Sequence, residues 1–332
     1  MRRLSLEQYV DGVLRGDRVI LARAITVIES ELSSDSELAA QMLDRLLPYS
    51  GNSRRIGITG VPGAGKSTFI DAFGMLLINE YGENLAVLSI DPSSPISGGS
   101  ILGDKTRMER LSADDRAFIR PSPSRGHLGG VARRTRETML LCEAAGYRNI
   151  LVETVGVGQS ETAVRSMTDF FLLLMLAGAG DELQGIKRGI IEMLDGMAIT
   201  KADGDNKPKA ERARAEYTHA LHLFPVSADG WTPPVVTCSS ITGVGLVEIW
   251  QMILDHRQLA ENKGFLAERR SRQALEWMNE LLLTGIEESF RKNPKVAALL
   301  PLLQEEVRRG SVTPFAASRD LLRQYHPVVN GR

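Results

Sequence analysis

A glycine-rich loop at residues 60–68 reads Gly60-Val-Pro-Gly-Ala-Gly65-Lys66-Ser67-Thr68. It follows a short apolar segment, Arg55–Thr59, and precedes a helical pattern that begins at Phe69. A strand, a G-x-x-x-x-G-K-[S/T] loop and a helix in this order form a phosphate-binding unit. The glycines let backbone N–H groups approach phosphate oxygens, and the helix N-terminus adds a favourable dipole. We expect Lys66 to reach the β- and γ-phosphates of a nucleotide and Ser67 to ligate Mg²⁺.

Short apolar runs continue after this loop and alternate with helix-length segments. The runs span residues 56–59, 85–90, 150–153, 170–176, 197–200 and 235–238. Several lack the strict alternation of half-exposed strands, as expected of strands covered on both faces. The sequence therefore predicts an α/β fold with a doubly wound, mostly parallel sheet, in which ligands bind at the carboxyl ends of the strands.

The two ends of the chain have a helical pattern instead. Residues 1–50 contain three apolar periodicities, and the first follows a capping-box pair, Ser5 and Gln8. We expect an N-terminal helical extension at 1–50, a P-loop domain at 51–259 and a C-terminal helical extension at 260–332. Apolar positions of the last extension, such as Leu275 and Leu282, need a surface to cover, either on a second copy of the chain or on its own P-loop domain.

Composition argues against several classes of protein. The 332 residues include 40 Lys and Arg against 41 Asp and Glu, a formal net charge of −1, whereas nucleic-acid and anionic-membrane binders need a basic excess. The two cysteines, Cys142 and Cys238, are too few for a disulfide framework. The chain starts without a signal-peptide pattern, and its longest apolar run, 170–179, is short of the roughly 20 residues of a spanning helix. We expect a cytoplasmic protein without nucleic-acid or membrane partners.

Two carboxylates at predicted strand ends are candidates for a metal site. The segment Ile150-Leu-Val-Glu153-Thr-Val-Gly156 has the spacing of the DxxG loop of GTPases, with Glu in place of Asp. We expect Glu153 to hold Mg²⁺ through water and the Gly156 N–H to meet the γ-phosphate. Asp91 ends another predicted strand before Pro-Ser-Ser and is either a metal ligand or a turn cap.

The segment between these carboxylates has the composition of a switch. Residues 97–108 contain three glycines, Asp104 and Arg107, and such a loop can order over a γ-phosphate and its metal. Asp104 is either a metal ligand or a helix cap, and Arg107 is either catalytic or solvated. Val157 occupies the position where Ras-like enzymes carry the water-orienting glutamine, so we expect slow intrinsic hydrolysis.

A third motif, Thr200-Lys201-Ala-Asp203, predicts the base that the protein recognises. It ends a predicted strand and matches the [N/T]KxD loop, with Thr200 in place of the commoner Asn. Asp203 can accept hydrogen bonds from both N1–H and the exocyclic amine of guanine, a pair that adenine does not offer, and Lys201 would lie along the base. Ser239, Ser240 and Ile241 follow the next strand and fit the loop that packs on the guanine oxygen. Together the motifs predict a GTP-hydrolysing enzyme.

The candidate site falls into three groups. The predicted catalytic residues are Lys66, Asp104, Arg107 and Glu153. The predicted metal ligands are Ser67, Asp91, Asp104 and Glu153. The predicted nucleotide-binding residues are Gly60, Val61, Pro62, Gly63, Ala64, Gly65, Lys66, Ser67, Thr68, Gly156, Thr200, Lys201, Asp203, Ser239, Ser240 and Ile241.

These segments together resemble the methylmalonyl-CoA-mutase-associated GTPases, the MeaB/ArgK family. The resemblance is carried by GVPGAGKST, SIDPSSPISGGSILGDKTRM, LVETVGVGQSE and TKADGDN and covers nearly the whole chain. It implies a metallochaperone-like P-loop GTPase that binds Mg²⁺ with GTP or GDP and forms a homodimer. It also implies that the partner is the adenosylcobalamin-dependent methylmalonyl-CoA mutase, whose cofactor loading the protein supports and which it protects from inactivation.

Two other functions compete with this interpretation. A metal-insertion GTPase would need a Cys/His cluster, and the pair His219 and His222 has no third ligand nearby. A kinase or transport-energising ATPase is disfavoured by the guanine motif at 200–203. A further loop, 178–189, carries Asp181 and Lys187 between glycines after the most apolar run, and is either a nucleotide-responsive loop or a polar connection.

Overall fold

The computed structural model describes residues 3–30, 32–90, 108–121, 128–154, 160–178, 188–223 and 230–325. The chain divides into two compact units, Met1–Gln273 and Ala274–Arg332. Asp91, Asp104, Arg107, Gly156 and Val157 lie outside the described residues, as do Asp181 and Lys187. The predictions made for these positions stay predictions.

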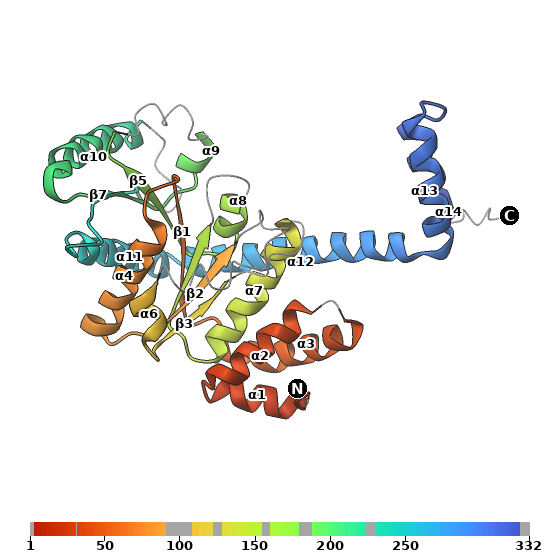
Figure 1. Cartoon of the computed structure of the whole chain (residues 1–332), viewed down its shortest axis with the longest axis horizontal. Helices are drawn as coiled ribbons and strands as arrows, with labels where there is room; N and C mark the ends of the chain where they lie inside the picture. Colours follow the sequence, from red (N-terminus) through yellow and green to blue (C-terminus); the bar gives the residue numbers. More distant parts are fainter. Residues whose placement is uncertain are drawn as a thin grey trace. The chain divides into compact units, whose positions relative to one another are not determined.

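The first unit is built on a seven-stranded parallel sheet (Figure 1). Its strands are β1 (Arg54–Gly60), β2 (Leu85–Ile90), β3 (Ala117–Arg120), β4 (Asn149–Thr154), β5 (Phe170–Leu176), β6 (Gly196–Thr200) and β7 (Val235–Thr237). The strand order β3-β2-β4-β1-β5-β6-β7 places β1 in the middle of the sheet. Nearly every residue of β2, β4 and β5 is buried, which explains their unbroken apolar runs. The predicted doubly wound α/β fold is confirmed.

One strand was absent from the predicted runs. β3 has four residues, Ala-Phe-Ile-Arg, and lies at one edge of the sheet beside β2. Its three apolar residues are buried, but the run is short and ends in Arg120, which pairs with Glu29.

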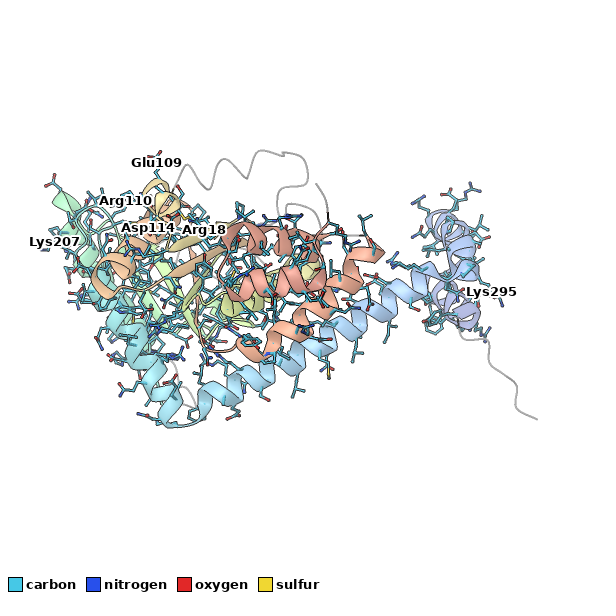
Figure 2. All side chains as sticks on the ribbon, turned by 90° about the horizontal axis from the view of Figure 1, so that it is seen from below. Arg18, Glu109, Arg110, Asp114, Lys207 and Lys295 are labelled. Carbon is cyan, nitrogen blue, oxygen red and sulfur yellow. The ribbon has the colours of Figure 1, made fainter. Side chains whose placement is uncertain are left out.

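Helices cover both faces of this sheet. They are α4 (Lys66–Tyr81), α6 (Glu109–Ala113), α7 (Leu128–Ala144), α8 (Ser160–Arg165), α9 (Arg188–Ile191), α10 (Lys207–Leu221), α11 (Leu246–Asn262) and the 3₁₀ turn η3 (Gly204–Asn206). Figure 1 shows α4, α6 and α11 on one side of the sheet and α7 and α8 on the other. In Figure 2, Arg110 stands on α6, and its Nε donates to Asp71 Oδ2 of α4 at 2.8 Å. The Leu111 N–H donates to Asp71 Oδ1 at 2.9 Å, so Asp71 fastens α6 to the helix that follows the glycine-rich loop.

The N-terminal segment forms the predicted helical extension. It contains α1 (Leu6–Leu14), α2 (Arg18–Glu29), α3 (Ser33–Leu46) and the 3₁₀ turn η1 (Leu47–Tyr49). The predicted capping box is present, because Gln8 N donates to Ser5 Oγ and Ser5 N donates to Gln8 Oε1. These helices pack on α7 and share one hydrophobic core with the sheet.

Three helices form the rest of the chain: α12 (Phe265–Lys292), α13 (Pro294–Arg308) and α14 (Pro314–Tyr325). In the second unit, α13 and α14 pack on each other through Val296, Leu303, Ala317 and Leu321. The α12 side chains Leu275, Met278, Leu282 and Ile286 are 49–58% exposed.

Candidate nucleotide site

The glycine-rich loop joins β1 to α4 at the carboxyl end of the sheet. Gly63 and Gly65 have φ values of 79° and 81°, a left-handed conformation that glycine adopts without steric cost. The Lys66 side chain folds back across the loop, and its Nζ donates to the Gly60 carbonyl at 2.8 Å. An ammonium in this position can exchange the Gly60 carbonyl for phosphate oxygens and neutralise their charge.

The surroundings of Lys66 tune its charge. The pKa of Lys66 is lowered, chiefly because burial disfavours the ammonium form, and the charges of Glu153 and Glu161 partly offset this effect. Glu161 lies in the first turn of α8 and is 1% exposed. No role was predicted for Glu161, although it ends the segment LVETVGVGQSE. The sequence feature that could have identified Glu161 is its position in the helical segment just after the strand-end carboxylate Glu153.

The metal side of the site brings two predicted ligands together. Ser67 Oγ donates to Glu153 Oε1 at 3.3 Å, and Glu153 is 5% exposed at the end of β4. Next to it, Thr154 Oγ1 donates to Thr59 Oγ1 at 2.8 Å and joins the ends of β4 and β1. A hydroxyl and a carboxylate oxygen are hard ligands, and this donor set fits Mg²⁺.

The base-reading motif follows β6, and its backbone bends sharply there. Lys201 has φ 56°, and no other non-glycine among the described residues has a positive φ. Asn206 Nδ2 donates to the Lys201 carbonyl at 2.7 Å and holds this bend. The Ala202 N–H donates to the Cys238 carbonyl at 3.0 Å. The loop after β6 is thereby joined to the loop after β7.

Asp203 and Ser239 meet between these two loops. Ser239 Oγ donates to Asp203 Oδ2 and accepts from the N–H groups of Ile241 (3.3 Å) and Thr242 (3.2 Å). Ser239 is fully buried, Ser240 is half-buried and Ile241 is 83% exposed. The Ser239 hydroxyl therefore orients the Asp203 carboxylate through its Oδ2 oxygen.

Thr200 connects the two halves of the site. It is the last residue of β6, is 2% exposed, and its Oγ1 lies 2.8 Å from the Ala64 carbonyl of the glycine-rich loop. The same hydroxyl lies 3.0 Å from the Met175 carbonyl of β5. The predicted phosphate and base loops therefore lie at the same edge of the sheet and share a direct side-chain contact.

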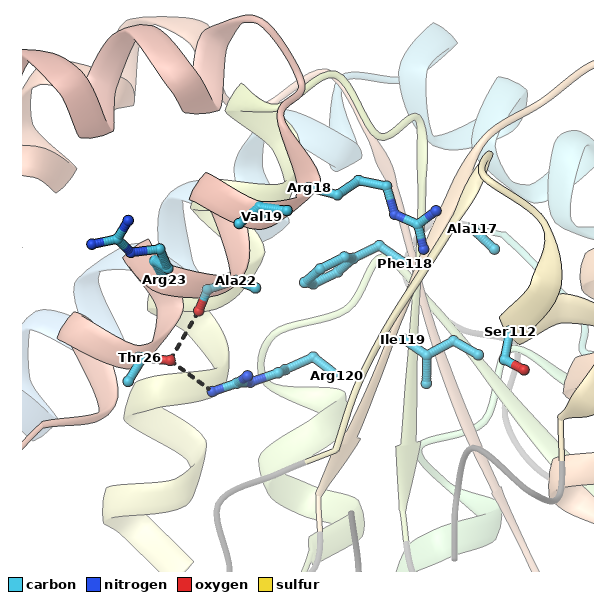
Figure 3. Close-up of a pocket in the computed structure, with 10 residues that line it drawn as sticks. All are labelled: Arg18, Val19, Ala22, Arg23, Thr26, Ser112, Ala117, Phe118, Ile119 and Arg120. Carbon is cyan, nitrogen blue, oxygen red and sulfur yellow. Dashed lines mark hydrogen bonds between the residues drawn. The ribbon is translucent and has the colours of Figure 1, made fainter. Parts of the chain in front are cut away.

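A separate pocket of about 420 Å³ lies at the opposite margin, between α2 and the edge strand β3 (Figure 3). None of the predicted site residues lines it. Arg18 pairs there with Asp115 at 2.7 Å, and Arg120 forms an ion pair with Glu29 and a 3.5 Å hydrogen bond to Thr26 Oγ1. These contacts join the N-terminal helices to the sheet edge.

In the described part of the chain, no three His, Cys, Asp or Glu residues gather closely enough to hold a metal ion. His219 lies near the end of α10 and His222 follows it, both exposed. Among the same residues, no helix combines the length and the hydropathy that a membrane span requires.

Comparison with known proteins agrees with this geometry. Residues 21–295 match the family model described as "Methylmalonyl Co-A mutase-associated GTPase MeaB". "GTPase ArgK" of Escherichia coli is 51% identical over 276 residues, 83% of each chain. "Methylmalonic aciduria type A homolog, mitochondrial" of Mus musculus is 45% identical over 333 residues, 96% of this chain and 80% of that protein. A crystal structure titled "LAO/AO transport system kinase" superposes with a TM-score of 0.75 at 38% identity, covering 98% of this chain and 99% of the other. The chain is a GTPase, and it belongs to the MeaB family.

Proposed function

We propose that this GTPase is a nucleotide-driven chaperone of the adenosylcobalamin-dependent methylmalonyl-CoA mutase, supporting cofactor loading and protecting the mutase from inactivation. The observation that carries the proposal is the match of residues 21–295 to a family described by its association with that mutase. The described residues contain no cluster of three metal-ligating side chains, so the site gives a metal-insertion role no support.

In this proposal the loop 60–68 binds the phosphates of GTP. Lys66 exchanges the Gly60 carbonyl for phosphate oxygens, which compensates the phosphate charge. Ser67 and Glu153 would hold Mg²⁺, with Asp91 and Asp104 as further ligands, and the ion would supply charge stabilisation at the phosphates. Arg107 and the Gly156 N–H are proposed at the γ-phosphate.

The base is proposed to bind between the loops after β6 and β7. Asp203 accepts from the two guanine donors, Lys201 lies along the ring, and Ser239, Ser240 and Ile241 form the opposite wall. Ser239 supports this role because its hydroxyl orients the Asp203 carboxylate before any ligand arrives.

We also propose that the protein is a cytoplasmic homodimer that associates through its C-terminal extension, residues 260–332. The exposed apolar side chains of α12 support this proposal, because such side chains cost free energy in water. In the double variant Leu282→Ser, Ile286→Ser, light scattering should report a monomer. The matched surface change Glu280→Ser should leave the dimer intact. A wild-type monomer at micromolar concentration would refute the dimer.

The test of the chaperone role is steady-state GTP hydrolysis with and without the cognate mutase. Because Val157 provides no water-orienting amide, the isolated protein should be slow. The mutase should raise the rate at least about tenfold, equivalent to about 1.4 kcal/mol of barrier. ATP in place of GTP should give no stimulated turnover. Lys187→Ala tests whether loop 178–189 transmits the effect. An unstimulated wild type would end the chaperone proposal, whereas a normally stimulated variant would remove only the role of that loop.

A further inference from the structure

The pocket between α2 and β3 has a wall of one charge sign. Its volume is about 420 Å³, which lies within the range of small-molecule sites. The charged residues that line it are Arg18, Arg23 and Arg120, and no Asp or Glu is found among its described lining residues. The pocket wall therefore offers positive charge to a ligand.

Two of these arginines cross the gap from opposite walls (Figure 3). Arg18 is the first residue of α2, and its Nη1 donates to Asp115 Oδ1 at 2.7 Å, just before β3 begins. Arg120 is the last residue of β3, and its Nη2 donates to Thr26 Oγ1 of α2 at 3.5 Å. Thr26 follows Arg18 by about two helical turns, or roughly 12 Å. The two arginines therefore bound a compartment of the length of a compact molecule.

The surface between the arginines is mostly apolar and follows the edge of the sheet. All four residues of β3 line the pocket. Because alternate side chains of a strand point to opposite faces, a pocket that touches all four lies along the outer edge of the strand. Across the gap stand Ala22 and Val19 of α2, and Val19 is 68% exposed. An apolar ligand body would shield this surface from water.

The two bridging arginines differ in how firmly they are held. The Asp115 side chain that pairs with Arg18 is 100% exposed, and an ion pair in water contributes little. The side chains of Arg120 and its partner Glu29 are only 26% and 12% exposed. Arg18 can therefore exchange its partner for a ligand, whereas Arg120 holds its place. Phosphate suits this exchange, because its oxygens match the fork of a guanidinium.

We propose that the pocket between α2 and β3 binds a compact organic phosphate, with the phosphate on Arg18 and the apolar body between Val19, Ala22 and β3. Arg120 closes the other end and adds to the positive field. No described residue of the proposed nucleotide site lines this pocket, so the ligand is a second one. An acidic peptide added as a strand to β3 is disfavoured, because it would have to pass both bridging arginines.

The probe is 1-naphthyl phosphate, which joins an aromatic body to a phosphate with about two negative charges at neutral pH. Titration calorimetry uses the full chain with excess Mg²⁺ and GDP, so that the loop 60–68 is closed to the phosphate of the probe. We expect saturable binding of one probe per chain. Both 1-naphthol, which lacks the phosphate, and inorganic phosphate, which lacks the ring, should bind at least about tenfold more weakly.

A matched pair of variants places the binding in the pocket. Val19→Glu brings a carboxylate to the wall and should weaken the probe at least about tenfold, because like charges repel. Val19→Gln has the same shape without the charge and should keep the wild-type affinity within about twofold. Both variants should fold, since Val19 is exposed.

The ion pair at the mouth gives a prediction of opposite sign. Arg18→Ala should weaken the probe about tenfold, the scale of a lost hydrogen bond to a charged group. Asp115→Ala removes the competitor of the ligand and should strengthen binding about twofold to fivefold, the scale of an exposed ion pair. If the pair only fastened α2 to β3, its loss from either side would give no gain in affinity.

Three results would overturn the proposal. The first is an absence of saturable binding, and the second is equal affinity for 1-naphthol, which would indicate an apolar pocket without phosphate recognition. The third is wild-type affinity in both Val19→Glu and Arg18→Ala, which would place the probe elsewhere. Tighter binding of an acetylated tetra-aspartate peptide would assign the edge to a peptide instead. None of these measurements uses the mutase, so a failed chaperone role leaves them unaffected.

Discussion

At the amino ends of β1 and β5, buried carboxylates and arginines bond to one another, whereas at the carboxyl end of β1 the Lys66 ammonium bonds to a backbone carbonyl. Asp169 receives Nε and Nη2 of Arg270 at 2.9 and 2.6 Å, and Arg55 contacts Glu143 at 2.8 Å. At the other end, Lys66 holds one carbonyl. Charges that neutralise each other fix the fold, and charges held by weak neutral partners stay available to a ligand.

The amino end should dominate stability. Asp169→Ala leaves Arg270 buried without its carboxylate, and breaking a buried pair in this way costs about 3–5 kcal/mol. Urea denaturation measures the free energy of unfolding. The control Glu268→Ala removes an exposed pair with Arg272 and should cost below about 1 kcal/mol. Equal losses in the two variants would contradict the comparison.

Lys66→Ala should weaken nucleotide binding rather than stability. Loss of the ammonium should weaken GTP binding by about 2 kcal/mol or more, the typical contribution of hydrogen bonds to a charged group. The free energy of unfolding should not fall, because burial already disfavours the Lys66 ammonium. Calorimetry and denaturation together make the measurement, with the exposed Lys292→Ala as control. Normal GTP affinity would mean that the loop does not bind phosphate.

Asp203→Asn sharpens the assignment of the base. The amide replaces one acceptor by a donor, which matches xanthine rather than guanine, so preference should shift toward XTP by at least about tenfold, about 1.4 kcal/mol. Competition binding with GTP and XTP measures the shift. Asp205→Asn, two residues on and exposed, should leave the preference unchanged. GTP preference kept in Asp203→Asn would reject the guanine assignment.

The smallest expected effect is on the pH dependence of stability. Burial alone would raise the pKa of Asp169, but Arg270 outweighs it and holds the pKa below its ordinary value. A carboxylate whose pKa is lowered on folding stabilises the folded state fully when the pH is above its unfolded-state pKa, about 3.9. This stabilisation disappears as the pH falls through the folded-state pKa. The difference in unfolding free energy between wild type and Asp169→Asn should therefore be constant above about pH 5, which is about one unit above the unfolded-state pKa. This difference should shrink below about pH 4. A difference that does not change with pH would exclude this origin.

Local patterns predicted most of the fold and identified the loops that the structure brings to one edge of the sheet. The capping box, the glycine-rich loop and the central strands each depend on neighbouring residues, so the sequence alone carries them. The ion pairs at the amino end join residues about a hundred positions apart, such as Asp169 and Arg270, and no local period reveals them. The Thr200 contact with Ala64 spans 136 positions, and it depends on the strand order that places the ends of β1 and β6 near each other.

The strand order also sets the distance between the phosphate loop and the base loop. The phosphate loop follows β1 and the base loop follows β6, two strand spacings apart, or roughly 9–10 Å. The proposed site thus has two subsites at a fixed separation, and a nucleotide links the groups that fill them. Once the phosphates bind, the base reaches its loop at a high effective concentration. Backbone hydrogen bonds maintain this separation, so side-chain substitutions change the affinity of each subsite but not the span that a ligand must bridge.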